Sequence, residues 1–248
     1  MELSRKLAVA ALVALTAIVS SPHPVSARTG ESSEMRTLST HWRPVVTRWE
    51  NILVHHSERH RLDPDLVASV VWKESRGIHT AVGPTGAVGL MCIKPFPWRT
   101  TAEQLLNPST NVAWGTAILA HVIRDGKGDV YHALAAYNGG WDKIHQENTR
   151  RYAADVLGEY VSAVAVQKGY APDGDWVAVI GVDGLPGRRT LTVLGPHQPL
   201  ARHTERPLAN HVFWFSANGP ADTTVMTFAD PAGREVQVNL WIVPWGSL

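Results

Sequence analysis

The chain has 248 residues, with 23 lysines and arginines against 22 aspartates and glutamates. This balance of charge argues against nucleic acid as a partner, because nucleic-acid-binding domains usually present a basic face or stripe. The single cysteine, Cys92, excludes an intramolecular disulfide, so packing must stabilise the fold. Neutral carbohydrate and polymers of mixed charge remain compatible with this composition.

The N-terminal residues have the pattern of a secretory signal peptide. The basic residues Arg5 and Lys6 precede an apolar run over 7–19, and small residues lead up to Ala27. A membrane anchor is the alternative, but the run is shorter than the roughly 20 apolar residues that span a bilayer. We therefore predict removal of residues 1–27, secretion to the periplasm or the extracellular space, and no transmembrane anchor after cleavage.

The residue pattern changes twice after this segment. Residues 28–41 are polar and predict a disordered leader, 42–170 have helical periodicity, and 175–248 contain short β-branched and aromatic runs separated by turn residues. We predict an α+β multidomain chain, with a helical domain followed by a small all-β module, most simply an Ig-like sandwich. The expected strands cover 176–180, 190–194, 211–215, 223–228 and 235–243.

One acidic residue stands out in the helical half. Asp63 is a good N-cap, Pro64 suits the first helical position, and Glu74 continues the apolar stripe of that helix in its last turn. Burial and the negative end of the helix dipole both raise the pKa of such a carboxyl group. The alternative is that Glu74 reaches water or pairs with Lys73 or Arg76.

A glycine-rich segment follows this helix. Gly83, Gly86 and Gly89 recur at intervals of three, which suits the wall of a substrate cleft because glycine lets the backbone approach a ligand closely. A surface loop without a role is the alternative. A phosphate-binding loop is excluded, because Lys94 is not followed by Ser or Thr opening a helix. Further helices are expected: one capped by Asn107 or Ser109 and ending near Gly126, one capped by Asp129 and ending at Gly139, and one over about 149–167.

Four short motifs occur in order within the helical half. They are Glu74-Ser75, Gly86-Ala87-Val88-Gly89-Leu90-Met91, Ala136-Tyr137-Asn138-Gly139-Gly140 and Tyr152. Together they resemble the soluble lytic transglycosylase family, whose catalytic domain is a lysozyme-like α bundle, and the resemblance runs from about residue 45 to 160. It implies an enzyme that cleaves the glycan strands of peptidoglycan, with no metal and no cofactor.

The resemblance also implies roles for individual residues. Glu74 resembles the catalytic acid of the family, while Cys92 replaces its usual Gln and Gly83 replaces a usual Ser, two positions that normally place a polar group near the sugar. Trp98 lies in a loop and is our candidate for stacking on a sugar ring. The expected substrate-binding residues are Ser75, Gly89, Leu90, Met91, Cys92, Trp98, Tyr137, Asn138 and Tyr152.

No Asp or Glu occurs between Glu74 and Glu103, so the segment after the acid supplies no second carboxylate, although Asp129 or Asp142 could fold into that place. The resemblance implies a 1,6-anhydro product, formed with help from the N-acetyl group of the substrate. The alternatives are a hydrolase similar to goose-type lysozyme and a non-catalytic wall-binding protein.

Two other chemistries are disfavoured by the sequence. His56 and His60 have the i, i+4 spacing of zinc ligands, but Ser57 stands where the metalloprotease motif has Glu, so we expect a solvated helix face. Cys92 as a nucleophile is a weaker interpretation than its replacement of the family Gln.

Overall fold

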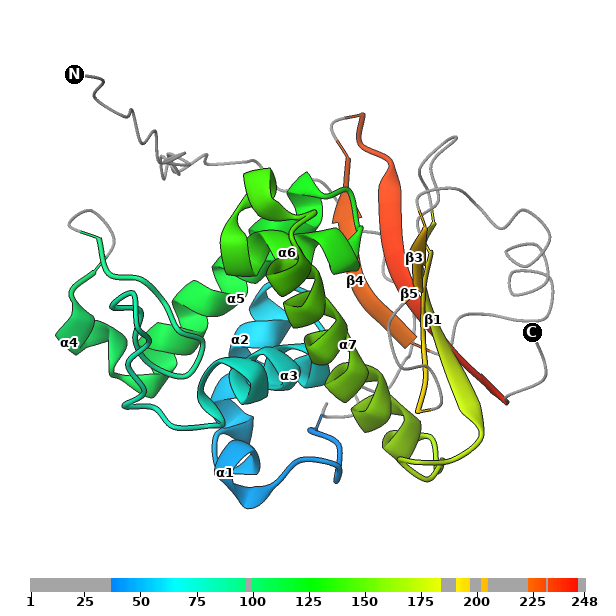
Figure 1. Ribbon diagram of the computed structural model, residues 1–248, viewed down its shortest axis with the longest axis horizontal. Helices are drawn as coiled ribbons and strands as arrows, with labels where there is room; N and C mark the ends of the chain where they lie inside the picture. Colours follow the sequence, from blue (N-terminus) through cyan, green and yellow to red (C-terminus); the bar gives the residue numbers. More distant parts are fainter. Residues whose placement is uncertain are drawn as a thin grey trace, which may run out of the picture. The chain divides into compact units, whose positions relative to one another are not determined.

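The computed structural model describes residues 37–96, 100–183, 191–196, 202–204, 223–230 and 232–244. The predicted signal peptide, Trp98 and the predicted strand over 211–215 lie outside these residues. The helical part, shown in Figure 1, contains α1 (Pro44–Thr47), α2 (Glu50–Arg59), α3 (Pro64–Ser75), α4 (Ala102–Leu105), α5 (Pro108–Asp125), α6 (Val130–Gly139), the 3-10 turn η1 (Trp141–Lys143) and α7 (Glu147–Gln167). Along the described residues, no helix combines the length and the apolar character needed to cross a membrane.

The helix starts follow their capping residues. The carboxylate of Asp63 accepts a hydrogen bond from the Asp65 amide at the start of α3, as predicted. Asn107 caps α5 and Asp129 caps α6 in the same way. The last helix begins at Glu147, two residues earlier than predicted from the sequence.

Helix α3 lies against α7, and the two run in opposite directions. At one end the Tyr160 hydroxyl of α7 donates a hydrogen bond of 3.0 Å to Asp63, and at the other end Tyr152 reaches Glu74. Helices α2, α5 and α6 complete the bundle around a fully buried set of aliphatic residues, in which α6 packs on α7 and α5 packs on both α2 and α6. The end of α3 is therefore held in place by α7.

The strands form one antiparallel sheet with the order β3-β2-β1-β5-β4. They are β1 (Trp176–Asp183), β2 (Leu191–Leu194), β3 (Arg202–Thr204), β4 (Thr223–Ala229) and β5 (Glu235–Pro244). Four of the five predicted strands are confirmed, and β3 was not predicted. The described strands belong to a single sheet, so a second layer, and with it the predicted sandwich, stays a prediction.

The sheet shares its hydrophobic core with the helices. Trp176, Ala178 and Ile180 alternate along β1 and belong to the same buried cluster as the α7 residues, while Val177 and Val179 lie on the other face in a small cluster of their own. The predicted boundary near residues 169–174 is therefore a change of secondary structure without a break in the core.

The predicted disordered leader is wrong for residues 37–41. Leu38 and Ser39 are buried, and the Ser39 hydroxyl donates a hydrogen bond of 2.7 Å to the Ala163 carbonyl of α7. The Ser39 amide and the Trp42 indole both donate to one carboxylate oxygen of Asp65, at 3.0 and 2.7 Å. Polar composition predicted disorder here, but these residues find specific buried partners.

Candidate active site

Glu74 lies in the last turn of α3, as predicted, and is half-buried. Its Oε1 atom accepts a hydrogen bond of 2.6 Å from the Tyr152 hydroxyl of α7. Burial raises the pKa of Glu74, while the bonds from Tyr152 and Cys92 and the charge of Lys73 act in the opposite direction. Lys73, the alternative ion-pair partner of Glu74, instead donates a hydrogen bond from its Nζ atom to Oδ2 of Asp155, at 2.5 Å.

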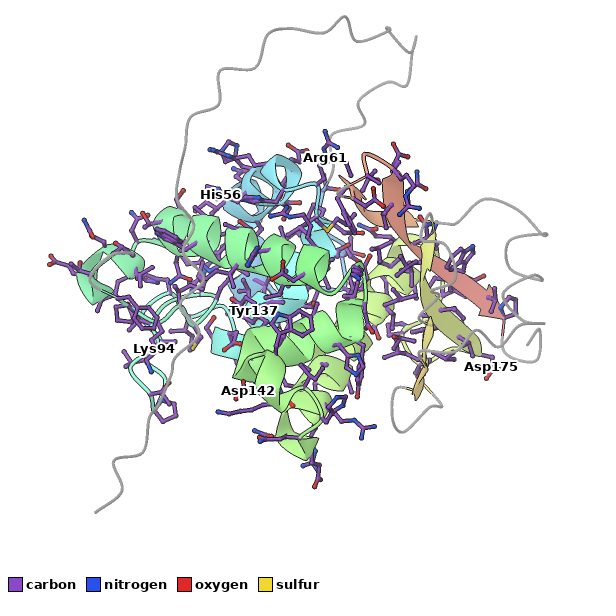
Figure 2. The ribbon with its side chains drawn as sticks, turned by 90° about the horizontal axis from the view of Figure 1, so that it is seen from above. His56, Arg61, Lys94, Tyr137, Asp142 and Asp175 are labelled. Carbon is purple, nitrogen blue, oxygen red and sulfur yellow. The ribbon has the colours of Figure 1, made fainter. Side chains whose placement is uncertain are left out.

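Two tyrosines from different helices meet near this acid. Tyr152 is almost fully buried, and burial together with the charge of Glu74 raises its pKa, so the phenol stays a donor. Tyr137, near the end of α6, donates a hydrogen bond of 2.9 Å to the carbonyl oxygen of Met91, and its side chain lies among the helices in Figure 2. The next residue, Asn138, is exposed. Folding thus brings Tyr152 to Glu74 and Tyr137 to the backbone of Met91, while a role of Asn138 in the site stays a prediction.

Cys92 lies directly beside the acid. Its sulfur is 3.9 Å from the backbone carbonyl oxygen of Glu74, and its backbone has a positive φ of 51°. Burial, followed by the charge of Glu74, raises the pKa of the thiol to about 12. A neutral thiol is a poor nucleophile, which argues against thiol catalysis. A Cβ atom on Gly83 would lie 3.6 Å from this sulfur, so the two positions that depart from the family pattern are neighbours.

Several predicted binding residues support the loop from inside. Ser75, Leu90 and Met91 are buried, and the Ser75 hydroxyl donates a hydrogen bond of 2.8 Å to the Leu90 carbonyl. Gly89 has a φ of +83°, and a Cβ atom there would lie 2.1 Å from the side-chain nitrogen of Asn111. The contacts described for these four residues are with other parts of the protein. Their predicted contact with a sugar therefore stays a prediction.

Asn111, for which the sequence predicted no role, organises the glycine-rich segment. This fully buried side chain of α5 accepts a bond from the Met91 amide at 2.8 Å and donates to the carbonyls of Val88 and Leu105 at the same distance. An Asn on the apolar face of an amphipathic helix is the signal that predicts this supporting role, because a buried amide group needs hydrogen-bond partners. Asn111 therefore holds the loop that carries Met91 and Cys92.

Neither Asp129 nor Asp142 is among the groups that shift the pKa of Glu74. Asp129 stands at the opposite end of α6 from Tyr137, eight residues or roughly 12 Å along the helix axis. Its oxygens accept from the His132 amide and contact the His132 ring, both at 3.0 Å. Asp142 is exposed on η1. Among the described residues, the groups that shift the pKa of Glu74 include no carboxyl group.

The predicted solvated face around His56 is wrong. His56 is 7% exposed, and its Nε2 atom lies 3.0 Å from the Ser109 hydroxyl of α5. Burial lowers the pKa of His56, and of His60 on the same helix end, so both favour the neutral form. Within the described part of the chain, no group of three potential ligands is placed to hold a metal ion.

Comparison with known proteins gives a consistent result for the helical part. Residues 52–156 match the family described as the transglycosylase SLT domain. The chain is similar to a transglycosylase of Enterobacteria phage PRD1, with 34% identity over 116 residues, and to the X polypeptide of Escherichia coli strain K12, with 32% identity over 114 residues. The family match over 52–156 includes Glu74, Tyr137 and Tyr152.

The matches cover part of each protein. The similarity to the phage transglycosylase spans 44% of this chain and 42% of the phage protein, and that to the X polypeptide spans 41% of this chain and 67% of the relative. An inactive mutant of the lytic transglycosylase Slt from Pseudomonas aeruginosa aligns in structure with a TM-score of 0.45 at 24% identity, over 52% of this chain and 25% of that one. The strands β1 to β5 lie outside the family match.

Proposed function

Because the chain belongs to the transglycosylase SLT domain family, we propose that it is a secreted peptidoglycan lytic transglycosylase with Glu74 as its catalytic acid. The enzyme cleaves the β-1,4 bond between N-acetylmuramic acid and N-acetylglucosamine and forms a 1,6-anhydro product. The observation that carries this proposal is the half-buried carboxyl group of Glu74, with its raised pKa and its bond to Tyr152.

In the first step, Glu74 protonates the glycosidic oxygen as the bond to the sugar breaks. A general acid must stay protonated near working pH, which the raised pKa of Glu74 favours. Tyr152 occupies Oε1 as a donor, so the acidic proton is carried by Oε2 and points away from the phenol. Tyr152 thereby orients the acid towards the substrate.

In the second step, the ionised Glu74 takes the proton of the C6 hydroxyl of the muramic acid residue. That oxygen attacks C1 of the same sugar, which gives the anhydro ring without a water molecule. The N-acetyl group of the substrate supports the cationic centre in the meantime, in place of a second carboxylate. The bonds from Tyr152 and Cys92 stabilise the ionised form of Glu74 that this step requires.

The surroundings of Glu74 provide the rest of the proposed cleft. Tyr137 holds the carbonyl of Met91 and so fixes the loop beside the acid, and exposed Asn138 is available to a sugar. Cys92 presents a neutral thiol where a larger amide is expected from the family resemblance. We infer that the cleft is wider at this point and that Cys92 positions Glu74.

The product decides between this proposal and hydrolysis. Purified sacculi digested with the full-length chain should release muropeptides that end in 1,6-anhydro-N-acetylmuramic acid, lighter by one water molecule than the hydrolysed form. Mass spectrometry before and after borohydride treatment separates the two, because borohydride reduces free reducing ends and leaves the anhydro ring intact. Predominantly reducible products would mean a hydrolase similar to goose-type lysozyme.

A further inference from the structure

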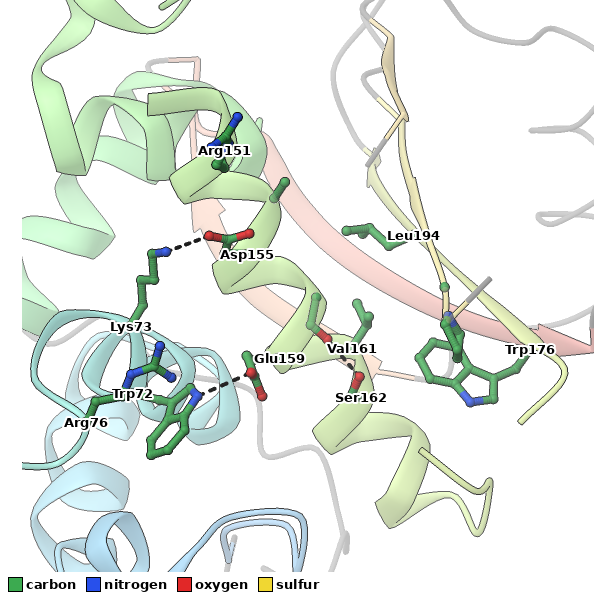
Figure 3. A pocket seen from close by; sticks show the side chains of 14 residues that line it. Trp72, Lys73, Arg76, Arg151, Asp155, Glu159, Val161, Ser162, Trp176 and Leu194 are labelled. Atoms are coloured by element: carbon green, nitrogen blue, oxygen red, sulfur yellow. Dashed lines mark hydrogen bonds and ion pairs between the residues drawn. The ribbon is translucent and has the colours of Figure 1, made fainter. Parts of the chain in front are cut away.

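A cavity of about 430 Å³ lies between α3, α7 and the strands β1 and β2 (Figure 3). This volume is within the range of roughly 300 to 1,000 Å³ that small-molecule sites occupy. The cavity is separate from the proposed cleft, because Glu74, Tyr137 and Tyr152 are not among its lining residues. On α3 it is lined by Trp72, which lies roughly 200° around the helix from Glu74, and by Lys73, which directly precedes Glu74.

Helix α7 exposes bare backbone to this cavity at Gly158. Glycine in the middle of a helix is less stable than alanine, so its presence calls for a steric reason. Gly115 has one, because a Cβ atom there would lie 2.2 Å from the sulfur of Met91. At Gly158, apart from its chain neighbours and the backbone of the same helix, no described atom lies within 4 Å of the Cβ position. The space over the helix is open, and a ligand can approach the backbone there.

Most charged groups around the cavity are already paired. The Lys73 ammonium contacts Asp155 at 2.5 Å, which Figure 3 shows as a dashed line. Glu159 accepts a bond of 3.2 Å from the Trp72 indole and lies 3.1 Å from the His41 ring, and these contacts lower its pKa. Each of these charged groups thus has a partner within the protein.

Arg76 is the exception. Its guanidinium carbon lies 4.4 Å from the centre of the Trp72 ring. Among the described residues no carboxylate forms an ion pair with it, although its charge contributes to the lowered pKa of Glu159. Arg43 lies over the same ring at 5.3 Å and adds a second positive charge beside the cavity. A guanidinium over an indole ring can still donate hydrogen bonds, and its fork of donors matches the geometry of a carboxylate.

We propose that this cavity binds a short peptide with a free carboxylate, with that carboxylate on Arg76 and the peptide backbone over Gly158. The inference rests on the proposed function in one respect, since the peptide stems of peptidoglycan are the source of such a ligand. The stem would bind on α3 and α7 while the glycan strand occupies the cleft at Glu74. The sheet closes the cavity with Trp176 and Leu194 and so takes part in substrate binding.

Isothermal titration calorimetry of the full-length chain tests the proposal. The probes are the synthetic tripeptide L-Ala-γ-D-Glu-L-Lys and its counterpart with every carboxylate amidated. We expect the first to bind and the second to bind at least about tenfold more weakly, because the charge-assisted bonds to Arg76 are lost. Arg76→Gln should weaken binding of the carboxylate form about tenfold and leave the amidated form unchanged.

Filling the cavity provides the second variant. Gly158→Leu should abolish measurable tripeptide binding, whereas Gly158→Ala, the matched control, should bind better than Gly158→Leu and melt at a higher temperature than the wild type. Neither variant should alter cleavage of glycan strands from which the peptides have been removed. Absence of tripeptide binding, equal binding of both probes, or full binding by both Arg76→Gln and Gly158→Leu overturns the proposal.

The experiments distinguish failure of the peptide site from failure of the proposed function. Anhydro products from the wild type without tripeptide binding would overturn the peptide site and leave the transglycosylase activity in place. Tripeptide binding together with reducible products would support the peptide site and overturn the lytic reaction.

Discussion

Helix α3 carries a carboxyl group with a raised pKa near each of its ends. Asp65 is 1% exposed and is enclosed by donors from Ser39 and Trp42, and burial is the main cause that raises its pKa to about 6. Glu74 is half-buried and is held on one oxygen by Tyr152. The same physical effect acts at both ends, but only Glu74 is partly exposed to solvent. A raised pKa therefore indicates an active site only together with access.

The largest expected effect is a difference in catalytic activity between variants of Glu74 and variants of Asp65. Glu74→Gln removes the proton donor and should reduce release of muropeptides by about 10² to 10⁴ or more without loss of helical signal. The matched variant Asp65→Asn should retain activity close to that of the wild type. Wall digestion by Glu74→Gln within tenfold of the wild type would show that the acid is misassigned.

The second prediction concerns the pH dependence of stability. Because the folded chain holds the proton of Asp65 more tightly than the unfolded chain, the free energy of unfolding should fall as pH rises from about 4 to about 6, by roughly 3 kcal/mol. Asn cannot ionise, so Asp65→Asn should lose this part of the decrease. Urea unfolding at pH 4 and pH 7 measures it, and identical pH slopes in both proteins would contradict the burial argument.

The third prediction compares two variants, each of which removes the hydrogen-bond donor to one carboxyl group of α3. The bond from Tyr152 stabilises the ionised form of Glu74, so Tyr152→Phe should raise the pKa of Glu74 and move the alkaline side of the rate profile up by as much as about one pH unit. Trp42→Phe removes the indole donor to Asp65 and should leave that profile in place. A downward shift for Tyr152→Phe would mean that the phenol stabilises the protonated acid.

The smallest effect is expected at Cys92. Cys92→Gln places an amide beside Glu74 in the same positive-φ conformation and should leave folding intact, with turnover equal to that of the wild type or up to about tenfold higher. Cys92→Ala, the control, should show whether the thiol bond to Glu74 contributes. A large loss of turnover in Cys92→Gln without unfolding would assign the thiol a role of its own.

The sequence alone determined the local part of this protein. Asp63 capping α3, Glu74 in its last turn and four of five strands were predictable, because capping and hydrophobic periodicity depend on residues close together in the chain. The candidate acid followed from the same local pattern. The motif resemblance then predicted Tyr137 and Tyr152 in one site; in the structure Tyr152 bonds Glu74 and Tyr137 bonds the Met91 carbonyl.

Contacts between groups that are far apart in the sequence depend on the tertiary structure. Tyr152 reaches Glu74 across 78 residues of sequence, and Ser39 reaches Ala163 across 124, so neither contact has a local signal. The shared core of helices and sheet, the support of the loop by Asn111 and the cavity beside Gly158 depend on packing between elements that are separate in the chain. Local propensity cannot encode these contacts, because each depends on the shape and donors of a partner that folding brings into place.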